Sequence, residues 1–543
     1  MTLRKTLALA MTLAAAMALW GCSSSDSPTD PCGEKAASDP IAMLTSNVKF
    51  GNVRTPFRFD ASASEDPDCS SRKLYYRWDT NADGTIDVPA SGWSESPTLE
   101  LNFATEGNHL VMVHVSSDGN ATSKRSASAG LLVEIVTREY AAIETWVGTG
   151  LAGGSADGTP LRATDLFTTM DITLTDNGTA YIVDWQNHKI VTVRDGKTYR
   201  VCGTGTLGDA PEGTARNAGL NHPTNISIDP QGRLVMAAWH NSMVMRIDPV
   251  VDSFVRLAGI RPAAGTNSNR CYEPADEGQP AIDACMDLPS GTAFDSDGNL
   301  YIADQKNIRI VRVSAVNGII TDHNETGPKS IFETIVGVPC DDPSNQSAPN
   351  CPDGGFNGNG IPAAQAFLSA PGSQSADPTS RIAIHDDVLY LADTENHQIR
   401  KVNLKVANPT IELVAGSIDL DASGRPLAGV SAENIAAAGA KLNRPCDVAV
   451  DDDGNVFIAD TRNHRIRRVD AVTGLITTVA GSGANNPPCI YNGGCDYTDD
   501  GALGDGGDSL LAYLQLPYGI DLDSAGNLYI VDTYHHRVRI VYK

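Results

Sequence analysis

Residues 454–469 read GNVFIADTRNHRIRRV, and this stretch decides the fold. A Gly-Asn pair precedes a short apolar run that ends at Asp460, and a polar turn then leads into a second run. Short apolar runs between turn residues are typical of buried strands. Related copies are GTAYIVDWQNHKIVTV at 178, GRLVMAAWHNSMVMRI at 232, GNLYIADQKNIRIVRV at 298, DVLYLADTENHQIRKV at 387 and GNLYIVDTYHHRVRIV at 526. Repetition at this period predicts one supersecondary unit per copy.

Each copy is flanked by two further strand-like segments. The preceding one ends near Asp or His, as in NISID and DVAVD, and the following one ends in Gly, as in ELVAGS and ITTVAG. The unit therefore has four strands. Its apolar strand, its Asp-x-x-Asn-His turn and its terminal Val-Ala-Gly resemble the NHL repeat, with departures at Ala238, Ser242 and Ile308. The resemblance implies an all-β, six-bladed β-propeller over residues 140–543.

The two ends of the repeat array complement each other. The sixth unit stops after its third strand, whereas IETWVGTG at 143–150 is an isolated fourth strand placed before the first unit. Pairing the two would complete the last blade and remove its exposed edges. We expect the propeller to be closed in this way by its own N-terminal strand.

The repeated polar residues have a structural interpretation. A carboxylate at the end of a strand can accept backbone N–H bonds in the following turn. Six copies would also be too many for a single site. We therefore expect a structural role for the repeated histidines and for the strand-end aspartates, which are Asp184, Asp304, Asp393, Asp460 and Asp532.

The first residues resemble an export signal. Arg4 and Lys5 precede an apolar run that is long enough for a signal peptide and short for a membrane span. Leu19-Trp20-Gly21-Cys22 resembles a bacterial lipobox, which implies removal of residues 1–21 and lipidation of Cys22; the alternative is an ordinary signal peptide with an incidental cysteine. The Ser, Asp and Pro-rich residues 22–40 would form a flexible linker. Because Ser23 is not aspartate, the resemblance implies a lipoprotein of the bacterial cell envelope, anchored in the outer membrane.

Residues 41–136 carry alternating strand patterns with turn signals, which predict a small Ig-like β-sandwich. The strings FRFDASASEDPD and LYYRWDTNADGTID within them resemble a PKD domain, in which Trp78 would be the core tryptophan.

The acidic loop of this domain has the spacing of an EF-hand-type calcium loop. Its oxygen ligands would be Asp79, Asn81, Asp83 and Asp87, while Ala90 replaces the bidentate glutamate. Binding should then be weak. An Asx-rich solvated hairpin is the alternative. We predict no cofactor for the propeller.

The cysteines fit an oxidising compartment. Without Cys22 ten remain, and we expect local disulfides that staple loops, together with buried free thiols at Cys202 and Cys446 in strand-like sequence. The predicted pairs are Cys271 with Cys285, Cys340 with Cys351, Cys489 with Cys495, and Cys32 with Cys69.

Charge and insertions bear on function. A formal net charge of −25 argues against nucleic-acid binding, which needs basic residues to displace phosphate counterions. The repeats differ in length mainly in the connections between one unit's fourth strand and the next unit's first, which carry the inserts. These connections are expected on the same face as the Asp-x-x-Asn-His turns. Loops on a rigid scaffold are the usual place for binding. The candidate binding residues there, each of which could instead pack under an insert, are Trp185, Trp239, Asp447, Tyr518 and Tyr534.

An enzymatic alternative comes from related propellers, which include amidating lyases and lactonase-like hydrolases. At the positions where the lyases bind zinc through histidines, this chain has Thr224, Ser290, Cys446 and Tyr518. None of these is a histidine, so the zinc triad is missing. The leading hypothesis is therefore a lipid-anchored, non-enzymatic protein that binds protein or glycan. The alternative is a lyase or hydrolase with a divergent metal site in the central channel.

Overall fold

The computed structural model describes residues 38–117, 125–260, 276–338, 354–371, 378–483 and 501–543. These residues form β-strands and short 3-10 helices, with no α-helix in the described ranges, as predicted for an all-β protein. None of the described helices is long and apolar enough to cross a membrane. The predicted signal peptide and the predicted lipidation site, Cys22, lie outside the described residues.

Two small sheets occupy the N-terminal part of the described chain. The described residues fall into two compact units, and the larger comprises those within 45–60, 98–111 and 130–543. Trp78 is buried, as predicted. One sheet has the order β1 (Thr45–Ser46), β3 (Phe57–Asp60), β5 (Thr98–Leu101), and the other β2 (Phe50–Gly51), β7 (Ser126–Ile135), β6 (Gly107–Ser116), β4 (Tyr75–Asp79).

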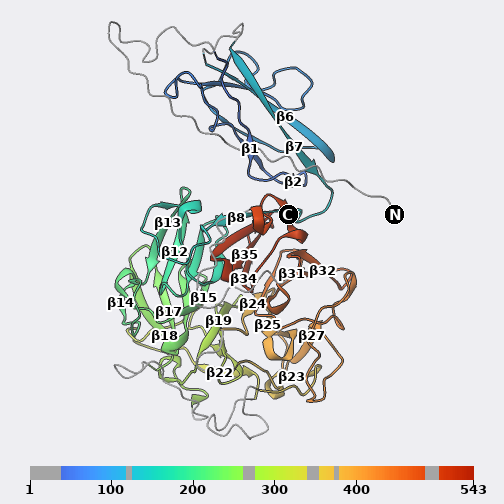
Figure 1. Cartoon of the computed structure of the whole chain (residues 1–543). Coiled ribbons are helices and arrows are strands. Elements are labelled where there is room, and N and C mark those ends of the chain that lie inside the picture. The colour runs from blue at the N-terminus through green and yellow to red at the C-terminus, as the bar shows by residue number, and fades with distance from the viewer. Residues whose placement is uncertain (1–37, 118–124, 261–275, 339–353, 372–377, 484–500) are drawn as a thin grey trace. The chain divides into compact units, whose positions relative to one another are not determined.

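Six further sheets, which we call blades one to six, surround a common centre, with β15, β19, β24 and β34 nearest to it (Figure 1). Blade one contains β10 (Thr169–Leu174), β11 (Ala180–Asp184), β12 (Lys189–Arg194) and β13 (Lys197–Cys202). Blade two contains β15 (Pro223–Ile228), β16 (Leu234–Ala238), β17 (Met243–Asp248) and β18 (Ser253–Ala258). Blade three contains β19 (Pro289–Phe294), β20 (Leu300–Asp304), β21 (Arg309–Val313) and β22 (Phe332–Val336).

The other three blades repeat this order from the innermost strand outward. Blade four contains β24 (Ile382–His385), β25 (Val388–Asp393), β26 (Gln398–Asn403) and β27 (Thr410–Gly416). Blade five contains β29 (Asp447–Val450), β30 (Val456–Asp460), β31 (Arg465–Val469) and β32 (Leu475–Ala480). Blade six contains β34 (Pro517–Leu522), β35 (Leu528–Asp532), β36 (Arg537–Val541) and β8 (Ala142–Val147).

The outer strand of blade six comes from the N-terminal side of the array. β8 pairs antiparallel with β36, so Val147 lies opposite Val538 and Ile143 opposite Val541. The predicted pairing of this segment with the last unit is confirmed. The innermost strands also contact one another in cyclic order, including β34 of blade six with β10 of blade one.

Short elements lie in the connections and turns. Two-residue strands add to the outer edge of five blades: β9 (Thr159–Pro160), β14 (Gly213–Thr214), β23 (Ile361–Pro362), β28 (Ile435–Ala436) and β33 (Gly507–Asp508). The 3-10 helices are η1 (Leu161–Ala163), η2 (Ala215–Asn217), η3 (Trp239–Asn241), η5 (Ala281–Asp283), η6 (Ala363–Gln365), η7 (Thr394–Asn396), η8 (Thr461–Asn463), η9 (Gly501–Leu503), η10 (Ser509–Leu511) and η11 (Thr533–His535).

Apolar side chains of neighbouring blades pack against each other. Phe457 of blade five and Leu528 of blade six, for example, share one cluster and are both fully buried. Burying a side chain of this size stabilises a fold by about 1.5–3 kcal/mol. Because each blade buries both faces against its neighbours, the blades depend on one another for stability.

The described cysteines test part of the thiol prediction. Cys202 and Cys446 are buried free thiols, as predicted. Each predicted disulfide includes at least one cysteine outside the described residues, so those pairings stay predictions.

Candidate functional site: the channel ring and the connection face

One structurally equivalent position in each innermost strand lies at one end of the central channel. In five blades this residue pairs with the next-to-last residue of the second strand. In blade four the corresponding contact is the Ala392 backbone N–H donated to the Arg381 carbonyl. We call these six residues the channel ring: Asp171, Asn225, Gly291, Arg381, Asp447 and Gly519.

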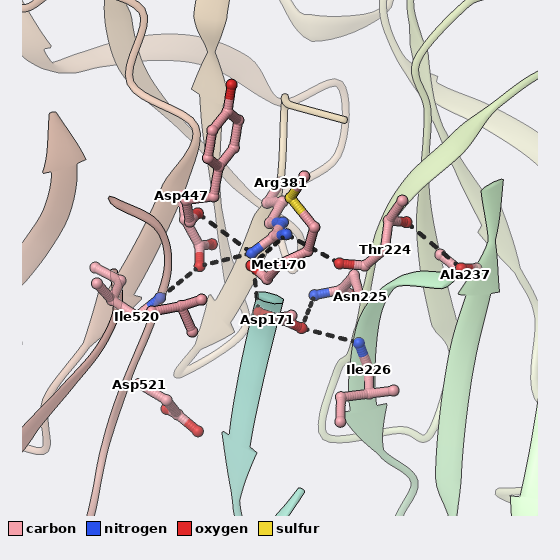
Figure 2. Close-up of polar contacts among 12 residues, drawn as sticks. Met170, Asp171, Thr224, Asn225, Ile226, Ala237, Arg381, Asp447, Ile520 and Asp521 are labelled. Carbon is pink, nitrogen blue, oxygen red and sulfur yellow. Dashed lines mark hydrogen bonds and ion pairs between the residues drawn. The ribbon is translucent and has the colours of Figure 1, made fainter. Parts of the chain in front are cut away.

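Arg381 reaches across the channel ring from blade four (Figure 2). Its guanidinium is fully buried and donates from Nη1 to Asp171 Oδ1 at 2.9 Å and to Asp447 Oδ2 at 3.4 Å. It also donates to the carbonyls of Met170 at 2.8 Å, Thr224 at 2.9 Å and Tyr518 at 3.2 Å. One side chain therefore connects blade four to blades one, two, five and six.

Two glycines of the ring leave room for this arginine. A Cβ at Gly519 would lie 2.6 Å from the Met170 carbonyl oxygen and 3.0 Å from Arg381 Nη1. A Cβ at Gly291 would lie 3.1 Å from Arg381 Cα. Glycine is needed at Gly519 because a methyl group would collide with backbone.

Three polar ring residues also connect their blade to the next one. Asp171 Oδ2 accepts the backbone N–H of Ile226 at 2.9 Å, and Asp447 Oδ2 accepts that of Ile520 at 3.0 Å. Asn225 Oδ1 accepts the Thr292 N–H at 2.8 Å. The carboxylates of the ring are thus engaged in holding innermost strands side by side.

The channel continues as a cavity of about 300 Å³ lined by all six innermost strands. Asp521 borders it and accepts the Leu174 backbone N–H at 2.7 Å. Burial raises the pKa of Asp521 to about 7, although this hydrogen bond opposes the rise. Burial likewise raises the pKa of Asp171 to about 7, against the attraction of Arg381.

Two predicted binding residues belong to this network. Asp447 lies in the ring with Arg381, and Tyr518 is buried, with its carbonyl on the same guanidinium. Both therefore contribute to the core of the ring. Arg381 itself was not among the predicted residues, although it is the one basic residue among the six ring positions.

The repeated histidines join successive blades. His397 and His464 adopt the left-handed conformation, and their Nδ1 atoms accept backbone N–H bonds from the next blade, from Arg444 at 3.2 Å and Leu516 at 3.1 Å. His188 accepts the His222 N–H at 3.3 Å. His536 accepts the Thr168 N–H at 3.1 Å, which joins blade six to blade one. The histidines therefore have the structural role that their periodicity predicted.

The strand-end aspartates are structural as well, but the prediction that their backbone N–H donors lie in the following turn was wrong. Asp393 Oδ1 accepts the N–H of Ser369 at 2.8 Å, and Asp460 Oδ1 that of Asn443 at 2.8 Å. These donors lie in the connection before the blade, because the turn and that connection are adjacent on one face. The following turn contributes a side chain instead, as Asn396 Nδ2 donates to Asp393 Oδ2 at 2.9 Å.

A group of rings lies on this connection face, where blades one and two meet. The His222 ring centroid is 4.6 Å from that of Trp185, 4.5 Å from His188 and 4.9 Å from His240. All four rings are partly buried, and we call them the aromatic–imidazole patch. Burial and the neighbouring imidazoles lower the pKa of His222 to about 3, so its ring is neutral at physiological pH.

The other predicted aromatics differ in exposure. Trp239 is fully buried, and the binding role predicted for it stays a prediction. Tyr534 is partly buried and packs against the apolar cluster of blades one and two. Of the five predicted binding residues, Trp185 and Tyr534 are the two that remain partly accessible.

The acidic loop of the N-terminal sheets uses its oxygens locally. Asp79 accepts the backbone N–H groups of Asp83 at 3.2 Å and Gly84 at 2.9 Å, and Asn81 Oδ1 accepts the Asp83 N–H at 3.1 Å. Asp87 accepts from Thr80 at 2.7 Å. Within the described ranges no group of three or more His, Cys, Asp or Glu is arranged to hold a metal ion. This geometry is that of the Asx-rich hairpin, and calcium binding stays a prediction.

Comparisons with known proteins identify the repeats. The Teneurin NHL domain model matches residues 168–314 and 379–488, and the NHL repeat model matches 514–541. The chain therefore carries NHL repeats.

Known relatives and solved structures are distant. The chain is 26% identical over 294 residues to Protein SUPPRESSOR OF QUENCHING 1, chloroplastic, from Arabidopsis thaliana, covering 48% of this chain and 25% of that protein. It is 25% identical over 265 residues to mouse Teneurin-1, covering 47% of this chain and 8% of that protein. The chain thus spans a quarter or less of these relatives. An auxiliary nutrient binding protein from Bacteroides thetaiotaomicron superposes with a TM-score of 0.46 at 13% identity, covering 93% and 98% of the two chains.

Replacing Arg381 with Met should destabilise the whole propeller, because it leaves two buried carboxylates without their counter-charge. Breaking a buried pair from one side costs about 3–5 kcal/mol. Urea unfolding would measure the loss, and adding Asp171→Asn and Asp447→Asn to Arg381→Met should recover part of it. Arg312→Met, which removes a partly exposed pair with Glu333, is the control and should cost less than about 1 kcal/mol. An Arg381→Met protein as stable as that control would contradict the role of the ring.

The histidine contacts predict a pH dependence. Burial and nearby arginines lower the pKa of His397 to about 4, whereas an unfolded histidine titrates near 6.5. The unfolded chain therefore takes up the proton first. Stability from His397 is complete above about pH 6.5 and is lost as pH falls toward 4, by at most about 1.4 kcal/mol per pH unit. The free energy of unfolding of the wild type relative to that of His397→Asn should fall from pH 7.0 to 5.5 and again to 4.5. A difference that does not change with pH would refute this.

Proposed function

We propose that this protein is a lipid-anchored binding protein of the bacterial cell envelope that recognises a protein or a glycan. The ligand would bind on the connection face of the propeller, at the aromatic–imidazole patch. The observation that carries this proposal is the contact of Trp185 with His222 in a group of partly accessible rings.

The chemistry of the patch supports recognition. Aromatic rings offer a large contact area at a small entropic cost, and tryptophan and tyrosine are enriched where proteins bind partners. A neutral His222 ring adds a further flat face beside Trp185 without the hydration of a charged imidazolium. The patch would therefore suit a ligand that presents an apolar face, such as a sugar ring or an apolar side chain.

The patch is also held rigidly. The His222 backbone N–H is bound to His188 Nδ1, and the His222 ring nitrogen Nδ1 lies 2.8 Å from Asn221 Oδ1 and 3.0 Å from His240 Nδ1. Trp185 follows directly after Asp184, which is fixed by the Phe167 N–H at 2.8 Å. A preformed surface loses little conformational entropy when it binds.

The connection face differs from the channel in what its groups already do. In the channel ring, Arg381 is paired with Asp171 and Asp447 and with three backbone carbonyls. These groups are buried and hold the blades together, whereas the patch lies in the turns of blades one and two and in the connection between them, and its rings stay partly accessible. This difference favours binding on the connection face.

The anchor would be the lipidated Cys22, with residues 23–40 as the tether. In bacteria that express the protein, Cys22→Ser should abolish incorporation of a palmitate analogue and move the protein from the membrane fraction to the soluble envelope fraction. Labelling of the Cys22→Ser variant at the wild-type level would rule out this anchor.

The binding proposal is tested by removing the partly accessible Trp185 ring. The chain from Ser23 to Lys543 would be screened on arrays of glycans and of envelope peptides, and the affinity for the best ligand measured by calorimetry. Trp185→Ala should weaken that affinity tenfold or more, because an aromatic contact of this kind contributes about 1.5 kcal/mol.

Trp93→Ala, a partly buried tryptophan of the N-terminal sheets, is the matched control and should bind as the wild type does. Equal affinities for Trp185→Ala and the wild type, with both proteins folded, would show that the ligand binds elsewhere.

A further inference from the structure

Several blades bury an arginine from the third strand in one recurrent location. In blade four, Arg400 Nη1 donates to Asp393 Oδ2 at 2.9 Å and to the Phe367 carbonyl at 3.2 Å, and its Nε donates to Asn359 Oδ1 at 2.9 Å. The side chain is completely buried. We call this location, between the strand-end aspartate and the preceding connection, the guanidinium slot.

Blade three fills its slot with the same kinds of contact. Arg309 donates to Asp304 Oδ2 at 2.9 Å and to the Cys285 carbonyl at 3.1 Å, and it lies 3.3 Å from Glu277. Glu277 also accepts the Thr334 backbone N–H at 2.8 Å. The slot therefore combines a strand-end carboxylate, a carbonyl of the preceding connection and a further acid or amide, which in blade three is also bonded to the fourth strand.

Blade two lacks both halves of this arrangement. Ala238 stands where the other blades have the strand-end aspartate, and Met243 and Met245 stand at the two positions that supply basic residues elsewhere. All three are buried in one apolar cluster. Blade two thus has an apolar slot in place of the ionic one.

Blade one combines the acidic half of the ionic slot with a smaller basic half. Asp184 is the strand-end carboxylate, and Asp157 accepts the Arg200 backbone N–H at 2.7 Å, as Glu277 does from Thr334 in blade three. At the two basic positions stand Lys189 and Val191. Lys189 Nζ lies 3.4 Å from Asp184 Oδ2 and donates to the Ser155 carbonyl at 3.4 Å, so it takes the first two acceptors of the slot.

A cavity of about 420 Å³ lies beside these residues. Its lining includes Ser155, Asp157, Lys189, Val191, Thr198 and Arg200. The volume is within the range of small-molecule sites. Val191 occupies the position, three residues after the left-handed histidine, from which Arg400 fills the slot of blade four.

We propose that this blade-one slot binds a guanidinium group supplied from outside the propeller. The Asp157 carboxylate would be its charge partner, and its side chain is as exposed as that of Glu277 in the filled slot, 43% against 40%. Planar guanidinium groups match carboxylates by two parallel hydrogen bonds. The site is separate from the aromatic–imidazole patch and does not depend on the proposed function.

Three neighbouring cations, Lys189, Arg200 and Arg216, limit how the guest can fit. Lys189 is already neutralised by Asp184, and Arg216 Nη1 lies 3.8 Å from Asp157 with about half of its side chain exposed. A pair of that length and exposure contributes little. The guest would displace it from Asp157.

The test uses calorimetry on the chain from Ser23 to Lys543, with N-acetyl-arginine methylamide as the mimic of an arginine within a protein and agmatine as the small-molecule form. The arginine derivative or agmatine should bind, and the one that binds more tightly identifies the source of the group. The citrulline derivative, a neutral isostere, should bind at least tenfold more weakly.

Val191→Arg is the decisive variant because it rebuilds the filled slot of blade four from within. It should abolish binding and leave the melting temperature unchanged or raised. Thr192→Arg adds the same charge to the same strand on its other side and should keep binding. Asp157→Asn offers a second route if Val191→Arg does not fold, and it should weaken binding at least tenfold. Binding that persists in Val191→Arg or Asp157→Asn, equal binding of citrulline, or no binding of either guanidinium compound would overturn the proposal.

Discussion

The propeller depends on one buried charge at its centre. Arg381 extends from blade four into a space where water does not compete, and a buried guanidinium is tolerated only when it is paired and hydrogen-bonded. That requirement accounts for the residues around it. Asp171 and Asp447 supply charge, the carbonyls of Met170, Thr224 and Tyr518 supply the remaining acceptors, and Gly519 leaves the space.

The repeated residues act at a second level, between neighbours. Left-handed histidines receive an N–H from the next blade, and strand-end aspartates receive one from the connection before their own blade. Conformation and hydrogen bonding are linked here, because the positive φ at His397 or His464 turns Nδ1 toward the adjacent blade. Repetition therefore serves the scaffold, and the proposed recognition would rest on side chains that differ between the repeats, such as Trp185 and Asp157.

The sequence predicted what depends on local periodicity. The four-stranded units, the pairing of β8 with β36 and the buried thiols of Cys202 and Cys446 follow from alternation of apolar residues and from the mismatch of the array ends. The ring could not be predicted in this way. In most blades an irregularity in strand pairing precedes the ring residue, and nothing in the sequence shows that Arg381 spans the channel. Trp185 and Trp239 also look alike in sequence, yet long-range packing buries only the second completely.

The apolar slot of blade two has a consequence for how such repeats diverge. In a copy with the ionic slot, replacing the aspartate alone leaves a buried arginine without its charge partner. Replacing the arginine alone leaves a buried carboxylate without its charge partner. Either single step is less stable than both end states, of which one has Asp393 with Arg400 and the other Ala238 with Met245. The copies should therefore either keep the strand-end aspartate together with a basic residue at one of the two slot positions, as blades one, three and four do, or lose both, as blade two does. A copy that loses only one of them should lie in a fitness valley between these two classes.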